Sequence, residues 1–240
     1  MAKFNDAKNI IVGAAPIYIS SKDSTDTTYE AQYENLLEAG HITFSPRVSA
    51  KTTLAASAKV RNVGFTNNGL QITYNPTYED VTVDQLLDAA KLFKSSMQVM
   101  IMTEMSEATL QNVLTVFGQG TSTLTKNGTE SADQYPTKGA TSASDVDLTL
   151  GLEAGALGIA PTERQLISVG LAPTWAKGTS GDESATTERV YYARRVLSVQ
   201  QSQFTLARNT PTTFPVTFRL LPDADYVGSE YGKIIDRVLA

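Results

Sequence analysis

The sequence predicts a mainly β chain with one α-helix and long polar loops. Several segments alternate between apolar and polar residues, which is the pattern of a strand with one buried face. One segment has apolar residues at helical spacing together with start and stop signals. The stretches 45–60 and 118–144 are rich in small and polar residues and lack the character of a helix or strand, so they are expected to be long loops.

Two strands are predicted from clear alternation. In DVDLTLGLE (145–153), one face is apolar and the other carries Asp145, Asp147 and Glu153. In TFPVTFRLL (213–221), the inward residues are expected to be Phe214, Val216, Phe218 and Leu220. Pro215 cannot donate a ladder hydrogen bond, so this strand should lie at an edge or contain a bulge. Residues 96–102 and 187–200 also have strand character.

The segment VGFTNNGLQITYNPTYEDVTVDQ (63–85) predicts a turn, a short strand, a break at Pro76 and a second strand. In that second strand, one face carries Asp80, Thr82 and Asp84, and the other carries Val81 and Val83. The polar face is expected to meet water.

The helix is predicted in MSEATLQNVLTVFGQG (105–120). Ser106 is the expected N-cap and Gly118 the expected end. Its apolar stripe is expected to pack against a sheet and consists of Leu110, Val113, Leu114 and Phe117. Residues 28–40 have a weaker helical pattern.

No break in composition and no internal repeat divides the chain. Residues 1–240 are therefore expected to form a single domain, with an N-terminal segment of about residues 1–20.

Composition excludes several classes of function. The net charge is -5 and no stretch concentrates Lys or Arg, which argues against charge-driven binding of nucleic acid. The chain has no cysteine, so it has no disulfide and no cysteine-based zinc site. Its apolar runs are too short to span a bilayer, so no membrane partner is expected and the cytosol is the default location.

Catalytic signatures are missing, so we expect that the protein is not an enzyme and uses no cofactor. His41 is the sole histidine, and no nucleophile-elbow serine accompanies it. GQGTST (118–123) follows a helix, whereas a dinucleotide-binding loop follows a strand. The aspartate pairs at 145/147 and 223/225 lack the spacing of an EF-hand loop, so no metal site is expected.

Four segments in order resemble the major tail tube protein of tailed bacteriophages. They are VRNVGFTNNGLQITY (60–74), EDVTVDQLLD (79–88), MTEMSEATLQNVLTVFG (102–118) and TPTTFPVTFRLLPD (210–223). The matching residues are Val63, Gly64, Gly69, Val83, Asp84, Glu104, Leu110, Val113, Leu114, Phe117, Phe218, Pro222 and Asp223.

The resemblance implies a β-sandwich or partial barrel with one flanking helix. Six copies would form a ring, and stacked rings a tube that conducts the genome. The implied location is the tail of a virion that is made in the cytoplasm of a host bacterium. The implied partners are further copies of the chain, a tape-measure protein, tail-end proteins and, in a contractile tail, a sheath protein. Double-stranded DNA would only pass through.

Two sets of residues are candidates for roles in such a tube. The channel lining would comprise Asp80, Thr82, Asp84, Asp145, Asp147 and Glu153, whose carboxylates would repel DNA phosphates; an outer sheet facing solvent explains the same pattern nearly as well. A ring-stacking loop in the Ala/Ser/Thr-rich stretch would comprise Arg47, Lys51, Leu54 and Lys59.

The sequence is also compatible with other functions. A tail terminator or a head decoration protein is a related virion component. A carbohydrate-binding β-sandwich would need exposed aromatic residues, for which Trp175, Tyr191 and Tyr192 are the available cluster. A serine hydrolase would need His41 as its base.

Overall fold

A computed structural model describes residues 16–20, 60–82, 84, 88–126, 129–130, 147–154, 162–172, 187–199, 203–206, 208–209 and 211–238. The strands of the large sheet are β1 (Ile17–Ser20), β2 (Val60–Asn62), β3 (Thr66–Val81), β4 (Lys91–Met105), β8 (Arg164–Leu171), β9 (Thr187–Ser198), β10 (Phe214–Leu220) and β11 (Gly232–Val238). A small sheet contains β5 (Leu124–Lys126), β6 (Thr129–Glu130) and β7 (Leu148–Leu150). The helical elements are α2 (Leu110–Val116) and the 3-10 turn η2 (Thr121–Thr123).

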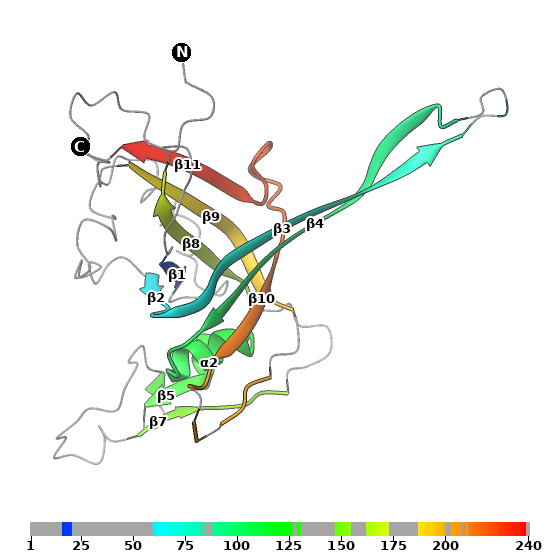
Figure 1. The fold of residues 1–240 in the computed structure, drawn as a ribbon. Helices are drawn as coiled ribbons and strands as arrows, with labels where there is room; N and C mark the ends of the chain where they lie inside the picture. Colours follow the sequence, from blue (N-terminus) through cyan, green and yellow to red (C-terminus); the bar gives the residue numbers. More distant parts are fainter. Residues whose placement is uncertain are drawn as a thin grey trace, which may run out of the picture.

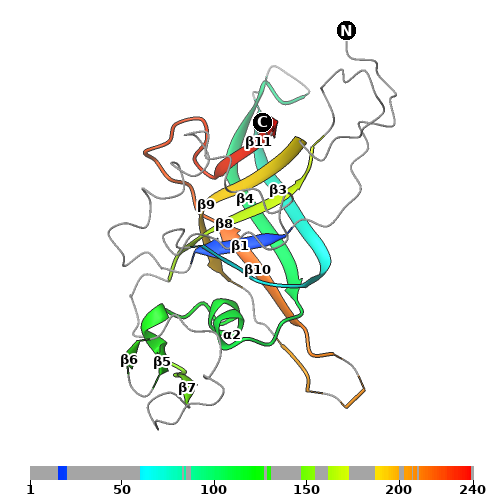
Figure 2. The ribbon, with the colours of Figure 1, turned by 90° about the vertical axis from the view of Figure 1, so that its left-hand side faces the viewer.

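The large antiparallel sheet forks at β9. One edge of β9 pairs with β8, while the other edge is shared: Thr187–Ala193 pair with β11 and Val196–Ser198 pair with β10. One layer therefore has the order β2-β1-β8-β9-β11, and the other continues as β10-β4-β3. Figure 2 shows β1, β8 and β9 crossing in front of β3, β4 and β10. This arrangement confirms the expected β-sandwich or partial barrel with one helix; the single domain over 1–240 stays a prediction.

The core lies between the two layers. It is formed by Ile17, Ile19, Val63, Val99, Ile101, Met105, Val116, Leu166, Ala193, Val196, Phe214, Val216, Phe218 and Leu220. The four residues of β10 that were expected to point inward are all buried, so that prediction is confirmed. The expectation that this strand lies at an edge or contains a bulge is wrong, because β10 lies between β4 and β9 and pairs with both without a register shift. Pro215 is tolerated because it lies opposite Glu104 of β4, and β9 pairs with β10 only from Phe218 onward.

Two buried strands have no alternating pattern in the sequence. β1, at the end of the N-terminal segment, lies between β2 and β8, and Ile17 and Ile19 are fully buried. Every β8 residue from Arg164 to Gly170 is also buried, so both faces of that strand are covered. A strand with two buried faces has no reason to alternate.

The small sheet corrects two predictions about length. The stretch 118–144 is not a continuous loop, because η2, β5 and β6 lie within it. The strand expected over 145–153 is limited to Leu148–Leu150 in the described residues, and Leu152 beyond it is 73% exposed. The predicted helix at 28–40 and all but Val60 of the predicted loop at 45–60 lie outside the described residues.

The helix is shorter than predicted. Its N-cap is Thr109 and not Ser106, because the Thr109 hydroxyl accepts a hydrogen bond from the Asn112 amide at 3.2 Å. The end at Gly118 is confirmed, with φ of 66°. The backbone amide of Gly118 donates to the Thr115 carbonyl, and that of Gln119 donates to the Leu114 carbonyl. This pair of hydrogen bonds is a Schellman motif.

The expected apolar stripe is only partly correct. Leu114 is buried and Val113 packs against the core, but Leu110 is half-buried and Phe117 is 40% exposed. The buried face also includes Asn112 and Thr115, because both accept hydrogen bonds from Arg61 of β2.

Candidate assembly surface

A two-stranded arm extends from the body of the protein (Figure 1). β3 and β4 stay paired out to Val81 and Lys91, whereas β10 supports β4 only from Met100 to Met105. We define the arm as Tyr74–Val81 and Lys91–Val99. Eight strand residues span about 26 Å, so the arm is long compared with the body that holds it.

Pro76 lies inside this arm and does not break it. The break predicted from the sequence is wrong, because β3 continues from Thr66 to Val81 and Pro76 pairs with Met97. β3 is the last strand in the order of the sheet, and an edge strand tolerates proline where no neighbour needs its amide.

The base of the arm is anchored at a bulge. The register of β3 against β4 shifts between Asn67 and Gln71, and Asn68 has a positive φ of 61°. The side-chain amide of Asn68 donates a hydrogen bond to the Glu104 carboxylate at 2.7 Å, and the Thr213 hydroxyl donates to the same carboxylate. Glu104 thus ties β3 and the start of β10 to β4, which fixes where the arm begins.

One face of the arm carries an apolar stripe, which we call the inner face. It continues the core-facing side of β4, where Val99 and Ile101 are buried. The paired residues on it are Ile72 with Ile101, Tyr74 with Val99, Pro76 with Met97, Tyr78 with Lys94 and Asp80 with Leu92. The register shift between Thr77 and Tyr78 leaves Ser95 unpaired, which keeps Lys94 and Leu92 on this face.

The stripe is exposed. The exposed fractions are 45% for Ile72, 65% for Tyr74, 58% for Tyr78 and 64% for Leu92. The opposite, outer face is mainly polar between Thr73 and Glu79 on β3 and at Ser96 and Gln98 on β4. A contiguous apolar strip on a projecting element is typical of an interaction surface.

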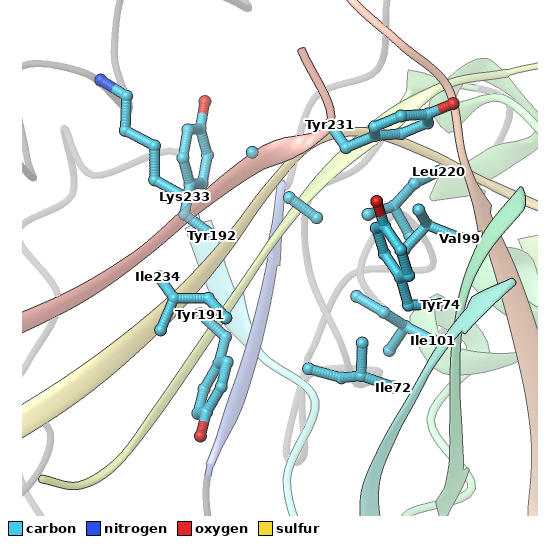
Figure 3. A pocket seen from close by; sticks show the side chains of 12 residues that line it. Ile72, Tyr74, Val99, Ile101, Tyr191, Tyr192, Leu220, Tyr231, Lys233 and Ile234 are labelled. Atoms are coloured by element: carbon cyan, nitrogen blue, oxygen red, sulfur yellow. The ribbon is translucent and has the colours of Figure 1, made fainter. Parts of the chain in front are cut away.

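A cleft lies at the base of the arm, between the two layers. Its volume is about 260 Å³. Figure 3 shows Ile72, Tyr74, Val99 and Ile101 on one wall and Tyr191 and Ile234 on the other. Ile234 is 66% exposed, so the cleft is open to solvent on the side of β11. The cleft exists because β10 and β11 leave the same edge of β9 in different layers.

An ion pair holds β11 to β9. The Arg189 guanidinium donates two hydrogen bonds to the Asp236 carboxylate, at 2.6 and 2.7 Å, across directly paired positions. The hydrogen bond from Arg189 is the main cause that lowers the pKa of Asp236. Both side chains are partly exposed, at 25% and 31%, so solvent screens the pair.

We expect Asp236→Asn to lower the free energy of unfolding at neutral pH by less than about 1 kcal/mol. A carboxyl whose pKa is lower in the folded state stabilises the fold above its unfolded pKa, which is about 3.9. That contribution is lost as the pH falls through the pKa of Asp236 in the folded state. The free energies of unfolding of the two proteins should therefore become equal in acid. Urea titrations at several pH values measure the difference; a constant difference down to the lowest pH would contradict the assignment.

The structure separates the residues that were candidates for a channel lining. Asp80 lies on the inner face of the arm with Tyr78 and Leu92. β3 ends at Val81, so Thr82 and Asp84 lie beyond the strand, where both are exposed, and Val81 is itself 42% exposed. The predicted alternating strand over 79–84 is therefore wrong in its bounds.

The other candidates lie elsewhere. Asp147 and Glu153 are exposed beside β7 in the small sheet, at the opposite end of the molecule from the tip of the arm (Figures 1 and 2). Asp145 lies outside the described residues, as do the stacking-loop candidates Arg47, Lys51, Leu54 and Lys59. The six candidates thus do not share one face.

The aromatic cluster considered for sugar binding is not assembled at the surface of the described residues. Tyr192 is 5% exposed, and its neighbour Tyr191 lines the cleft. Trp175 and His41 lie outside the described residues.

The described part of the chain has neither a cluster of metal-binding side chains nor a helix that could span a membrane. There, no group of three or more His, Asp or Glu side chains is placed to hold a metal ion. The described helices include none that is long and apolar enough to cross a membrane.

Neither a protein-family model nor a curated protein matches this chain. The case for a function therefore depends on the residues and their geometry.

Sequence reasoning missed the cleft and the exposed inner face. β11 has the sequence GKIIDRV, in which two adjacent isoleucines hide the alternation. The inner face of the arm was hidden by Pro76, which suggested two short strands. The unpaired Ser95 also reverses the alternation in β4, so the apolar residues of that strand do not follow a single period.

Proposed function

We propose that the protein is a structural component of a virion that assembles into stacked hexameric rings, as a phage tail tube does. The observation that carries the proposal is the arm, whose apolar inner face extends the core-facing side of β4 into solvent. The order of the four tail-tube-like segments supports the same conclusion.

An arm of this kind needs a partner surface to be stable. A two-stranded ribbon is marginal by itself in water, and exposed Tyr74, Tyr78 and Leu92 make it less favourable still. Burying these side chains against a neighbouring copy would stabilise the arm and remove the apolar strip from water. In a homo-oligomer with cyclic symmetry, every copy supplies the same contact, so the gain is repeated around the ring.

The geometry changes which residues are expected to face the channel or solvent. Asp80 shares the inner face with apolar side chains, so we now propose that the outer face of the arm is the one that faces the channel or solvent. That face carries Asn75, Thr77 and Glu79, none of which is basic. Lys91, paired with Val81, is the cation on the outer face of the arm and lies at its tip. Between Thr73 and Glu79 that face carries no cation, so it gives DNA phosphates little to bind and a duplex could pass without sticking.

Electron microscopy of the purified protein tests the proposal. We expect rings or hollow tubes in negative stain, together with a mass above that of the monomer in light scattering. Single rings that never stack would favour a tail terminator, and isolated trimeric or monomeric particles a head decoration protein. A monomer of 25.8 kDa at every concentration and ionic strength would contradict the proposed function.

A further inference from the structure

We infer that the arm of one copy docks into the cleft of the next copy, with its inner face covering the apolar walls beside β11. The inference depends on the proposed self-assembly and names the surfaces that make it. The contact is heterologous, because the arm and the cleft are different surfaces of the same chain. Such a contact joins copies head to tail and closes into a ring when the rotation permits.

The cleft is an incomplete part of the sandwich. In the layer of β10, β4 and β3, Ile72 and Tyr74 face the cleft, and both are substantially exposed. In the layer of β9 and β11, the sheet stops at β11, which pairs with β9 and with no other described strand. A strand laid along β11 would extend that layer and cover Ile72 and Tyr74.

The free edge of β11 is suited to receive such a strand. Its seven residues pair with β9 without a register shift, and it contains no proline. The outer edge of β3 is much less suitable, because it is interrupted by the bulge at Asn68 and by Pro76. A regular edge pairs readily with another chain, whereas bulges and prolines protect an edge. Among the described long edges, β11 is therefore the acceptor.

The strand that pairs with β11 is best supplied by β4 of the arm. From Lys91 to Val99, β4 is paired with β3 on one side and with no described strand on the other. It contains no proline, so each residue keeps its amide donor, although Ser95 makes the edge locally irregular. With β4 beside β11, the inner face of the arm can turn toward the cleft.

The apolar character of both surfaces favours a second copy as the occupant, because the same chain carries an exposed apolar arm face and an open apolar cleft. The walls of the cleft are mainly apolar, because the side chain of Lys233, the one charged residue among the described residues that line it, points away from Ile234 and out of the cleft (Figure 3). The arm carries Glu79, Asp80, Lys91 and Lys94, so its charge is balanced.

The area explains why a ring is favoured over a dimer. One face of a ribbon about 26 Å long and about 10 Å wide offers on the order of 260 Å². A stable interface buries about 800 Å² on each partner, so one arm in one cleft is a weak contact. In a closed ring each copy gives one arm and receives another, which doubles the contact made by each subunit.

Crosslinking between copies tests the inference. The chain has no cysteine of its own, so only the introduced cysteines can react. We would prepare two single-cysteine variants, Leu92→Cys on the inner face and Ile234→Cys in the cleft, and mix them under assembly conditions with a short bismaleimide. Both positions are exposed, at 64% and 66%, so the folds should be retained, and circular dichroism checks this. The expected product is a heterodimer, formed at least about tenfold more than with the matched control Phe93→Cys, which lies on the outer face and is 43% exposed.

The outcomes separate this inference from the proposed function. Equal yields from Leu92→Cys and Phe93→Cys, or a dominant Leu92 to Leu92 product, would overturn the arm-in-cleft contact. Tubes that form without the Leu92 to Ile234 product would overturn it as well, while leaving the proposed function intact. Absence of both assembly and crosslinking would overturn the two together.

Discussion

Replacing Gly232 by alanine is expected to detach β11 from β9 and to lower the free energy of unfolding by about 3 kcal/mol. Gly232 begins β11, has φ of 143° and pairs with Ala193. A Cβ at this position would overlap the carbonyl oxygen of Tyr192, which is backbone and cannot rotate away. Overpacking costs about 1–3 kcal/mol, and an unfavourable φ adds about 1 kcal/mol or more. Urea unfolding measures the loss.

Gly228→Ala is the matched control. Gly228 also has a positive φ, of 86°, but a Cβ there meets no atom within 4 Å. The free energy of unfolding of this variant should therefore fall by only about 1 kcal/mol, which is the cost of holding alanine at a positive φ. Equal losses for the two variants would mean that the contact with Tyr192 does not limit the position of β11. Because β11 forms one wall of the cleft, Gly232→Ala should also impair assembly, whereas Gly228→Ala should not.

Replacing Arg61 by methionine is expected to lower the free energy of unfolding by about 3 kcal/mol. The Arg61 guanidinium donates hydrogen bonds to Asn112 Oδ1 at 2.6 Å, to the Gln111 carbonyl at 2.8 Å and to Thr115 Oγ1 at 2.7 Å. Burial and the nearby Arg164 guanidinium lower the pKa of Arg61 to about 9, so it remains charged at neutral pH. Hydrogen bonds from a charged group contribute about 1.5–3 kcal/mol each, offset here by the cost of burying the charge.

Arg219→Met serves as the control for Arg61→Met. Arg219 lies on β10 with its side chain exposed, so its replacement should change stability by less than about 0.5 kcal/mol. Arg61→Lys should recover only part of the loss, because an ammonium group cannot reach three acceptors with the geometry of a guanidinium. Full stability in Arg61→Lys would show that charge alone, and not the fork of donors, holds α2 to β2.

The sequence predicted those elements whose two faces differ. β10 has a core face and a more polar face, so Phe214 and Phe218 could be assigned to the interior by alternation. β8 is buried on both faces and contains Arg164 and Ser168, so its sequence has no alternation to detect. In α2, the helix was predicted but its buried face only in part, because hydrogen bonding to Arg61 turns Asn112 and Thr115 inward. A long-range polar contact of this kind leaves no periodic signal.

The candidate surface was partly visible in the sequence. The region 63–85 was recognised as exposed and strand-forming, but the faces of the arm were assigned incorrectly. Alternation places Asp80 on a polar face only if its neighbours on that face are polar, and the register instead puts it beside Tyr78 and Leu92. The cleft could not be predicted, because it depends on how β10 and β11 share one edge of β9.

The position of β1 has a consequence for the order of folding during synthesis. β1 can complete its pairing only with β8, and the hydrogen bond from Arg164 to the Ser20 carbonyl joins residues 144 positions apart. A ribosome adds about 5–20 residues per second, so β1 waits on the order of 10 s for its partner. During that interval the arm has already emerged with its apolar face uncovered. Such late, non-local closure makes folding slow and leaves the nascent chain dependent on chaperones or on low local concentration to avoid premature association.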